Sequence, residues 1–285
     1  MTQTRRTALV LGAGGLVGGA WELGVLHGLA EAGADLSAAD LILGSSAGAV
    51  VAARLAAGTT TLAELYAGEV DGSAPAEPAA RLGTGNILRY ALALLTSRTP
   101  EAYGRKLGRL ALRAATVDEA ERRAVIARRL GPVADWPERR LLITAVDALT
   151  GELTALDKDA GAPLVDAVTA SCAIPGLWPP ATVNGRRLID GGLHSTANAH
   201  LAAGYERVVI VAPSTVGSRV IHSPARQGAD LAAAGRRVEV ITPDKASKAA
   251  FGRNPLDPSR RAPAARAGRA QAAAHAPAVT ALWAE

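Results

Sequence analysis

A serine set between two glycines is the strongest sign of chemistry in this chain. Residues 44–48 read Gly-Ser-Ser-Ala-Gly and fit the pattern G-x-S-x-G, with Ser46 at its centre. The residue pattern predicts a buried strand just before it, at 40–43, and a buried helix just after it, at 49–55. Between a strand and a helix this pattern is a nucleophile elbow, in which a Cβ at either glycine would collide with a neighbouring element. It therefore predicts a serine acyl-transfer site.

A glycine-rich loop, residues 12–19, follows the first predicted strand and has two interpretations. Its glycines could let a dinucleotide approach the backbone, or its N–H groups could stabilise a developing oxyanion. The oxyanion hole is favoured, because the G-x-G-x-x-G spacing is met by Gly12 and Gly14 but not at position 17. In addition, the second strand ends in the serine elbow and lacks the acidic residue that a dinucleotide site needs.

Asp190 is the residue that we expect to act as the base. It directly follows a predicted strand at residues 187–189, and functional groups collect at the carboxyl ends of strands in α/β sheets. A carboxylate at that place would take the proton of Ser46 during nucleophilic attack. The sequence Asp-Gly-Gly is also an ordinary turn, which is the alternative interpretation.

The elements that must position these groups alternate between strands and helices, which predicts a three-layer α/β fold with a mainly parallel sheet. Asn184-Gly185 predicts a hairpin within it. We expect one domain over residues 1–285, with a helical insert or cap at 59–135 and a loop at 243–268. The segment 59–135 fits a lid over the site and a set of outer-layer helices equally well. The remaining expected strands are 7–11, 140–146, 150–156, 181–183, 207–212 and 237–241, and the remaining expected helices are 20–32, 117–130, 163–172 and 270–283.

Composition excludes several classes of function. The formal net charge of +5 is modest, and no basic block alternates with aromatic residues, so nucleic-acid binding is not expected. The single cysteine, Cys172, precludes an intrachain disulfide and is expected to be a core residue. Five scattered histidines offer no metal-ligand spacing, so neither a metal nor a cofactor is expected. No apolar run reaches the length of about 18 residues that a membrane span needs, and we expect a cytoplasmic protein.

In order and spacing, these motifs resemble the patatin-like phospholipase family over nearly the whole chain. The family pattern is a glycine-rich oxyanion loop, then G-x-S-x-G, then D-G-G or D-G-A far downstream. The segment 170–176, which is followed by two prolines, is also similar to the family. Each motif is weak alone, and their occurrence together is specific. The matching positions here are Gly14, Gly15, Leu16, Val17 and Gly18, then Gly44 to Gly48, then Asp190, Gly191 and Gly192.

The resemblance implies a patatin-like fold and a serine lipid acyl hydrolase with a Ser–Asp dyad and no histidine in its mechanism. Ser46 would attack an ester carbonyl, Asp190 would be the general base, and an acyl-enzyme would form. The backbone N–H groups of Gly14, Gly15 and Leu16 would hold the oxyanion. The implied partners are a lipid or acyl-ester substrate and, peripherally, a membrane surface. The oligomeric state is not implied.

The oxyanion loop departs from the family pattern at two positions. Ala13 stands where the family usually has the first of three glycines, and Val17 stands where it commonly has Arg or Lys. The backbone donors are unaffected, so activity is expected to survive. The missing charge removes one reason to expect a preference for charged phospholipid head groups.

Other hypotheses use the same serine. An acyltransferase of the related fold would need a histidine base, for which His194 and His200 are the candidates. A Ser-His-Asp hydrolase would combine Ser46 and Asp190 with His222 or His275. A catalytically weak protein that binds lipid is a third alternative. For any lipid-binding role, Trp178 with the two prolines after it is the candidate exposed apolar patch.

Overall fold

The computed structural model describes residues 7–284, which form a mixed sheet of eight strands in the order β5-β6-β3-β2-β1-β7-β8, with β4 also paired to β3. The strands β3, β2, β1, β7 and β8 are parallel, whereas β4, β5 and β6 pair antiparallel. The expectation of a mainly parallel sheet is therefore confirmed. The bounds are β1 (Thr7–Leu11), β2 (Leu41–Ser45), β3 (Arg140–Asp147), β4 (Leu153–Leu156), β5 (Ala181–Val183), β6 (Arg186–Asp190), β7 (Arg207–Val211) and β8 (Arg237–Ile241).

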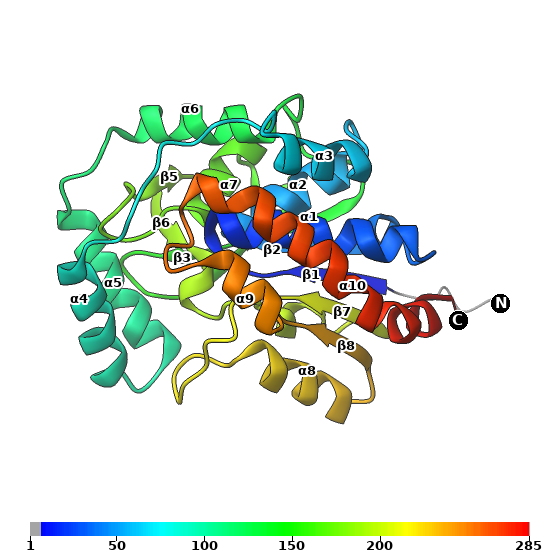
Figure 1. The fold of residues 1–285 in the computed structure, drawn as a ribbon. Helices are drawn as coiled ribbons and strands as arrows, with labels where there is room; N and C mark the ends of the chain where they lie inside the picture. Colours follow the sequence, from blue (N-terminus) through cyan, green and yellow to red (C-terminus); the bar gives the residue numbers. More distant parts are fainter. Residues whose placement is uncertain (1–6, 285) are drawn as a thin grey trace.

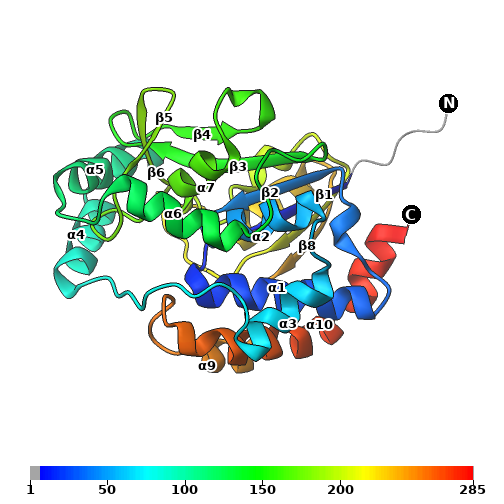
Figure 2. The same ribbon diagram turned by 90° about the horizontal axis from the view of Figure 1, so that it is seen from above.

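Helices cover both faces of the sheet, which confirms the three-layer α/β/α architecture (Figures 1 and 2). Successive side chains of a strand point to opposite faces, so Leu9 and Leu11 pack with α1, α2, α7 and α10, whereas Ala8 and Val10 pack with α8. The bounds are α1 (Gly15–Glu31), α2 (Ala47–Ala57), α3 (Leu62–Asp71), α4 (Thr84–Leu95), α5 (Pro100–Arg113), α6 (Glu119–Leu130), α7 (Leu164–Ser171), α8 (Pro224–Ala233), α9 (Lys245–Phe251) and α10 (Arg261–Ala284).

The prediction of a loop over residues 243–268 is wrong. This segment contains α9 and the first turns of α10. Asp244 caps α9 by accepting a hydrogen bond from the Ser247 N–H group. Pro263 lies in the first turn of α10, where an N–H group has no intrahelical partner to lose, so proline does not prevent the helix. The alanines that follow favour helix strongly.

The terminal helix α10 packs closely along α1 (Figure 1) because small residues line their contact. A Cβ on Gly24 would lie 2.0 Å from the Ala265 carbonyl oxygen, and one on Gly28 would lie 2.7 Å from the Ala272 Cβ. Both approaches are shorter than packed atoms allow, so α1 tolerates no side chain there. This contact fixes the axis of α1, whose first residues form the glycine-rich loop.

Residues 59–135 contain four helices, α3 to α6, joined by irregular segments. The segment between α3 and α4, residues 72–83, has no helix or strand and is called the connecting segment below. The predicted lid or outer-layer role of 59–135 stays a prediction, as does the single domain, whose outermost residues 1–6 and 285 lie outside the described residues. Across the described part of the chain, no helix combines the length and apolar character that crossing a bilayer requires.

Candidate active site

Ser46 lies at a strained turn between β2 and α2. Its φ of 54° and ψ of −119° lie where a non-glycine residue is rarely found, and such strain is typical of functional sites. A Cβ on Gly44 would lie 2.6 Å from the Ala49 Cα, and one on Gly48 would lie 2.5 Å from the Leu11 carbonyl oxygen. Both glycines are therefore needed, because β2 and α2 pass too close to each other and to β1 for side chains at these positions.

The backbone of Ser46 is fixed by the C-terminal end of α7. The Ser46 N–H group donates to the Ser171 hydroxyl at 2.8 Å, and the Cys172 thiol donates to the Ser46 carbonyl at 3.2 Å. Cys172 is buried, as expected, and burial raises the pKa of its thiol to about 12, so it is not a nucleophile. The segment 170–176 therefore serves the elbow through two contacts that the sequence pattern does not specify.

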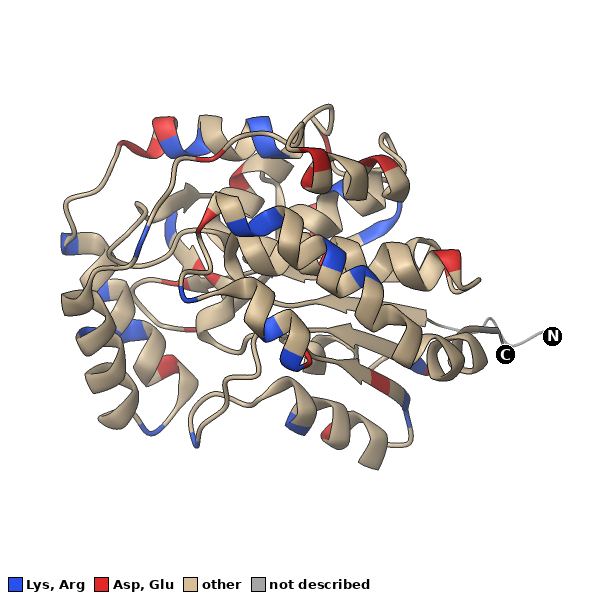
Figure 3. Ribbon diagram, viewed as in Figure 1, with Lys and Arg blue, Asp and Glu red and all other residues tan. Residues whose placement is uncertain are grey.

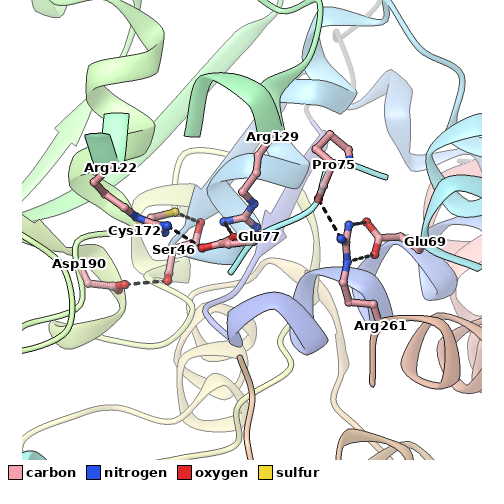
Figure 4. Close-up of polar contacts among 9 residues, drawn as sticks. All are labelled: Ser46, Glu69, Pro75, Glu77, Arg122, Arg129, Cys172, Asp190 and Arg261. Carbon is pink, nitrogen blue, oxygen red and sulfur yellow. Dashed lines mark hydrogen bonds and ion pairs between the residues drawn. The ribbon is translucent and has the colours of Figure 1, made fainter. Parts of the chain in front are cut away.

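The structure brings Ser46 and Asp190 together (Figure 4). The Ser46 hydroxyl donates to Asp190 Oδ2 at 2.7 Å, and both side chains are buried. Burial raises the pKa of Asp190 to about 6, although hydrogen bonds from Ser46 and the Gly192 N–H group and the charge of Arg122 oppose the shift. A carboxyl with this pKa is ionised at neutral pH and still basic enough to take a proton, which suits a general base.

Asp190 reaches Ser46 for a different reason from the one that the sequence suggested. Its strand, β6, runs antiparallel to β3, so the rule about carboxyl ends of parallel strands does not place it. Ser45 pairs with Thr144 and Asp190 pairs with Ala145, which puts the end of β6 level with the end of β2. Because β3 extends past the end of β2, the antiparallel strand β6 begins beyond the site. Its last residue, Asp190, lies in the site.

Asn198 joins the two halves of the site and was missed from the sequence. It has a left-handed backbone with φ of 54°, and its side-chain Nδ2 donates to the Ser45 hydroxyl at 3.0 Å and to the Gly191 carbonyl at 3.0 Å. The Ser45 hydroxyl also bonds to the Thr144 hydroxyl at 2.7 Å. Asparagine tolerates the left-handed region better than most residues, but nothing local marks this one as a brace.

The glycine-rich loop is the first turn of α1, which begins at Gly15 and not near residue 20 as predicted. Between residues 7 and 284, no acceptor takes the N–H groups of Gly14, Gly15 or Leu16. The flanking N–H groups are satisfied, since Ala13 donates to the Thr196 carbonyl and Val17 to the Pro255 carbonyl. Three unpaired donors at a helix N-terminus are suited to an anion.

The shape of this loop depends on close approaches to two other segments. Gly15 has φ of +67°, and a Cβ there would lie 2.6 Å from the Pro255 carbonyl oxygen. Cβ atoms on Gly14 and Gly18 would both collide with Pro213. Val17 is fully buried in the core, so packing fills the position where the family commonly has a basic residue.

The connecting segment is anchored beside the site by ion pairs (Figure 4). Glu77 is buried and pairs with Arg122 at 2.6 Å and with Arg129 at 3.1 Å, both on α6. Burial raises the pKa of Glu77, but the charges of Arg129 and Arg122 outweigh it and leave the pKa lowered. Arg261 of α10 donates to the Pro75 carbonyl at 3.0 Å and so anchors the same segment from the other side.

Trp178 does not form the exposed apolar patch expected of it. Its ring is half-buried, and the Arg122 guanidinium lies 4.1 Å above the ring centroid. A cation on the ring face is favourable, so this tryptophan helps to hold Arg122. The exposed large apolar side chains lie elsewhere, and half of those in the described residues are on α4.

The histidines form other contacts. His275 on α10 pairs with Glu239 of β8 at 2.8 Å, and His194 contacts the Asn198 side chain at 3.3 Å. His200 and His222 line a cavity of about 440 Å³ next to α8 together with His194. Within residues 7–284 the hydroxyl of Ser46 bonds to Asp190 and to no histidine. The same residues contain no cluster of three or more potential metal ligands.

Comparisons with known proteins give the following likenesses. A family model for patatin-like phospholipases matches residues 9–203. An uncharacterized NTE family protein of Mycobacterium tuberculosis is 35% identical over 223 residues, which are 78% of this chain and 51% of that protein, and one of Mycobacterium bovis gives the same values. The chain thus spans about half the length of the curated relatives that it matches.

Two solved structures align with most of the chain at low sequence identity. VipD from Legionella pneumophila has a TM-score of 0.48 and 14% identity, covering 96% of this chain and 67% of that chain. The type III effector protein ExoU has a TM-score of 0.46 and 18% identity, covering 97% of this chain and 53% of that chain.

Proposed function

We propose that this chain, which belongs to the patatin-like phospholipase family, is a serine lipid acyl hydrolase that acts through Ser46 and Asp190. The observation that carries the proposal is the 2.7 Å hydrogen bond from the Ser46 hydroxyl to Asp190 Oδ2 in a buried setting. A hydroxyl is a weak nucleophile until a base takes its proton, and Asp190 is the base within reach.

The first half of the reaction forms an acyl-enzyme. Ser46 Oγ attacks the ester carbonyl carbon while its proton passes to Asp190 Oδ2. The carbonyl oxygen becomes an oxyanion, which the free N–H groups of Gly14, Gly15 and Leu16 stabilise at the N-terminus of α1. The tetrahedral intermediate then expels the alcohol, which takes the proton from Asp190 as it leaves.

The second half releases the fatty acid. A water molecule donates its proton to the now ionised Asp190 and attacks the acyl carbonyl of Ser46. Collapse of the second oxyanion returns the proton to Ser46 Oγ and frees the carboxylic acid. Asp190 thus acts once as base and once as acid in each half, for which a pKa of about 6 is suitable.

A small cavity with a mixed lining lies next to the oxyanion loop. Its apolar lining residues include Leu16, Leu23, Val50, Val51 and Leu65, and the charged residues Arg54, Glu69, Arg129 and Arg261 line it as well, together with Pro75 of the connecting segment. Its volume of about 30 Å³ has room for about two water molecules. A fatty-acyl chain does not fit in this cavity as it stands.

Intact-mass labelling with a lipid-like fluorophosphonate tests the proposal. We expect one label per wild-type chain, none on Ser46→Ala and strongly slowed labelling of Asp190→Asn. Ser259→Ala is the control, because that serine is exposed and its hydroxyl donates to Asp257. A folded wild type that takes no label would contradict the proposal and favour a lipid-binding protein without turnover.

A further inference from the structure

Four large apolar side chains of α4 point into solvent. Ile87, Leu88, Leu92 and Leu95 are 52%, 70%, 62% and 76% exposed. Leu88, Leu92 and Leu95 follow the i, i+4, i+7 spacing and so form one stripe along the helix. Monomeric proteins seldom expose so many apolar groups together unless the surface binds a partner.

The same helix is attached to the protein by its other face. Ala93 is buried, the Tyr90 hydroxyl donates to the Pro175 carbonyl at 3.0 Å, and Asn86 Nδ2 donates to the Gly176 carbonyl at 2.9 Å. Tyr90 is close enough to Asp190 that, after burial, the charge of Asp190 is the next cause of its raised pKa. The leucine stripe therefore lies on the outer side of a helix that borders the active site.

Positive charge is concentrated in the hairpin that carries the leucine stripe. The α4–α5 hairpin, residues 84–113, carries six basic residues and one acidic residue, Glu101, for a net charge of +5. That value equals the formal net charge of the whole chain, so the rest of the sequence is balanced. Four of the six basic residues lie on α5, one lies on α4 and one lies in the loop between the two helices, and Figure 3 colours them blue. The six are Arg89, Arg98, Arg105, Lys106, Arg109 and Arg113.

A groove of about 730 Å³ runs between the two helices and combines both features. Arg89, Lys106, Arg109 and Arg113 line it together with Leu92. No carboxylate of the described residues pairs with Arg109 or Arg113. Arginines without partners beside exposed leucines match the two layers of a lipid surface, phosphate outside and hydrocarbon beneath.

We propose that the α4–α5 hairpin docks this protein on an anionic phospholipid bilayer. The leucine stripe inserts into the outer hydrocarbon, and the arginines of α5 bind the phosphates. The inference rests on the proposed function only in that docking brings lipid esters to Ser46. An uncharged bilayer would not satisfy the arginines, and a second copy of this chain would set like charges against each other.

Vesicle co-sedimentation of the full chain carrying Ser46→Ala tests docking without turnover. The vesicles are phosphatidylcholine alone, and phosphatidylcholine with phosphatidylglycerol in a two-to-one ratio. We expect binding to the anionic vesicles only. The variant Arg89→Gln/Arg109→Gln/Arg113→Gln removes three arginines that line the groove and should lower the partition coefficient about 100-fold, since each surface cation contributes about a fivefold factor. Leu88→Ser/Leu92→Ser/Leu95→Ser should lower it by about tenfold or more at any salt concentration.

Matched controls remove similar groups elsewhere on the surface. Arg226→Gln/Lys248→Gln/Arg253→Gln removes the same charge from other exposed sites, and Val216→Ser removes an exposed apolar side chain. Both should sediment like the parent. Melting curves of all variants exclude unfolding as a cause, and the two hairpin variants test the proposal independently.

Several results would overturn the docking proposal. These are equal binding to both kinds of vesicle, no binding to either, or hairpin variants that bind like the parent. A leucine variant that changes the oligomeric state would assign the stripe to a second copy, and retention on heparin without vesicle binding would assign the arginines to another polyanion. Fluorophosphonate labelling of wild type is measured separately, so loss of docking and loss of the serine chemistry are distinguished.

Discussion

The Ser46–Asp190 site and the α4–α5 hairpin are neighbours that are built in opposite ways. In the site, the N–H, carbonyl and hydroxyl groups of Ser46 each have a defined partner and the side chain is buried. In the hairpin, leucines and arginines face solvent, and Tyr90 and Asn86 provide polar attachment. In the terms of our two proposals, the reacting groups are preorganised before substrate arrives, whereas the docking surface stays unpaired until lipid covers it.

The space around Gly15 and Gly48 of the site differs from the space around Gly85 of α4. At Gly15 and Gly48 an added Cβ would meet backbone oxygen atoms at 2.6 and 2.5 Å. At Gly85 in α4 the nearest atom would be the end of the flexible Arg89 side chain at 3.9 Å. The site therefore depends on backbone packing that has no spare volume, whereas α4 has room at Gly85. The inner face of α5 is packed as tightly as the site, since a Cβ on Gly108 would lie 1.9 Å from the Ala148 carbonyl oxygen.

The largest effect that we expect comes from Asp190→Asn, which removes the proposed base. Turnover of a soluble monomeric ester should fall by about 10²–10⁴-fold in kcat/KM, the usual contribution of general acid–base catalysis. Asp230→Asn, an exposed carboxyl on α8, is the control and should leave this value unchanged. An equally large loss from Arg109→Gln on the soluble ester would break the contrast between the two regions.

Gly15→Ala should have the next largest effect. The strained φ and the contact with the Pro255 carbonyl oxygen should displace the oxyanion donors and lower kcat by about 10²–10³-fold. Gly19→Ala, four residues later in α1, should retain activity, because its Cβ would meet only ordinary contacts at 3.6 Å. Steady-state kinetics on both variants, with Gly85→Ala as the hairpin counterpart, measures the difference.

The activity of the site and the docking of the hairpin should depend on pH in different ways. Asp190 must be ionised to accept the serine proton, so with a pKa of about 6 the value of kcat/KM should fall tenfold per unit below pH 6 and level off above it. Vesicle docking through arginines should stay constant from about pH 6 to 8, because guanidinium does not titrate there. A profile that any single His→Ala variant abolishes would contradict the aspartate as base.

The smallest expected effect is on stability. The pKa of Asp190 is raised in the folded state, so the folded protein holds the carboxyl proton more tightly than the unfolded chain does. The ionised carboxyl therefore destabilises the folded protein, and the unfolding free energy falls as pH rises through 6. Asp190→Asn should therefore raise the unfolding free energy at pH 8 by about 1–3 kcal/mol and leave it nearly unchanged at pH 4. Thermal unfolding at both pH values measures this, and a lower melting temperature at pH 8 would contradict it.

Much of the fold could be predicted because its signals are local. The strands β1, β2 and β7 are short, mostly apolar runs, β8 alternates polar and apolar residues, and the hairpin of β5 and β6 follows from its Asn-Gly turn. The start of α1 was missed, because the glycines from Gly15 onward resemble a loop in sequence although they are helical. The helix α9 and the beginning of α10 were missed because proline and arginine hid a capped, alanine-rich segment.

By itself the sequence determined the elbow at Ser46, the glycine-rich donor loop and the order of the motifs, because steric rules for glycine act within a few residues. Only the tertiary structure decided that an antiparallel strand carries Asp190 to Ser46 and that Asn198 braces both. It also decided which leucines of α4 face solvent, since apolar residues occupy every side of that helix. Contacts between residues far apart in sequence depend on how whole elements pack, and no local pattern encodes them.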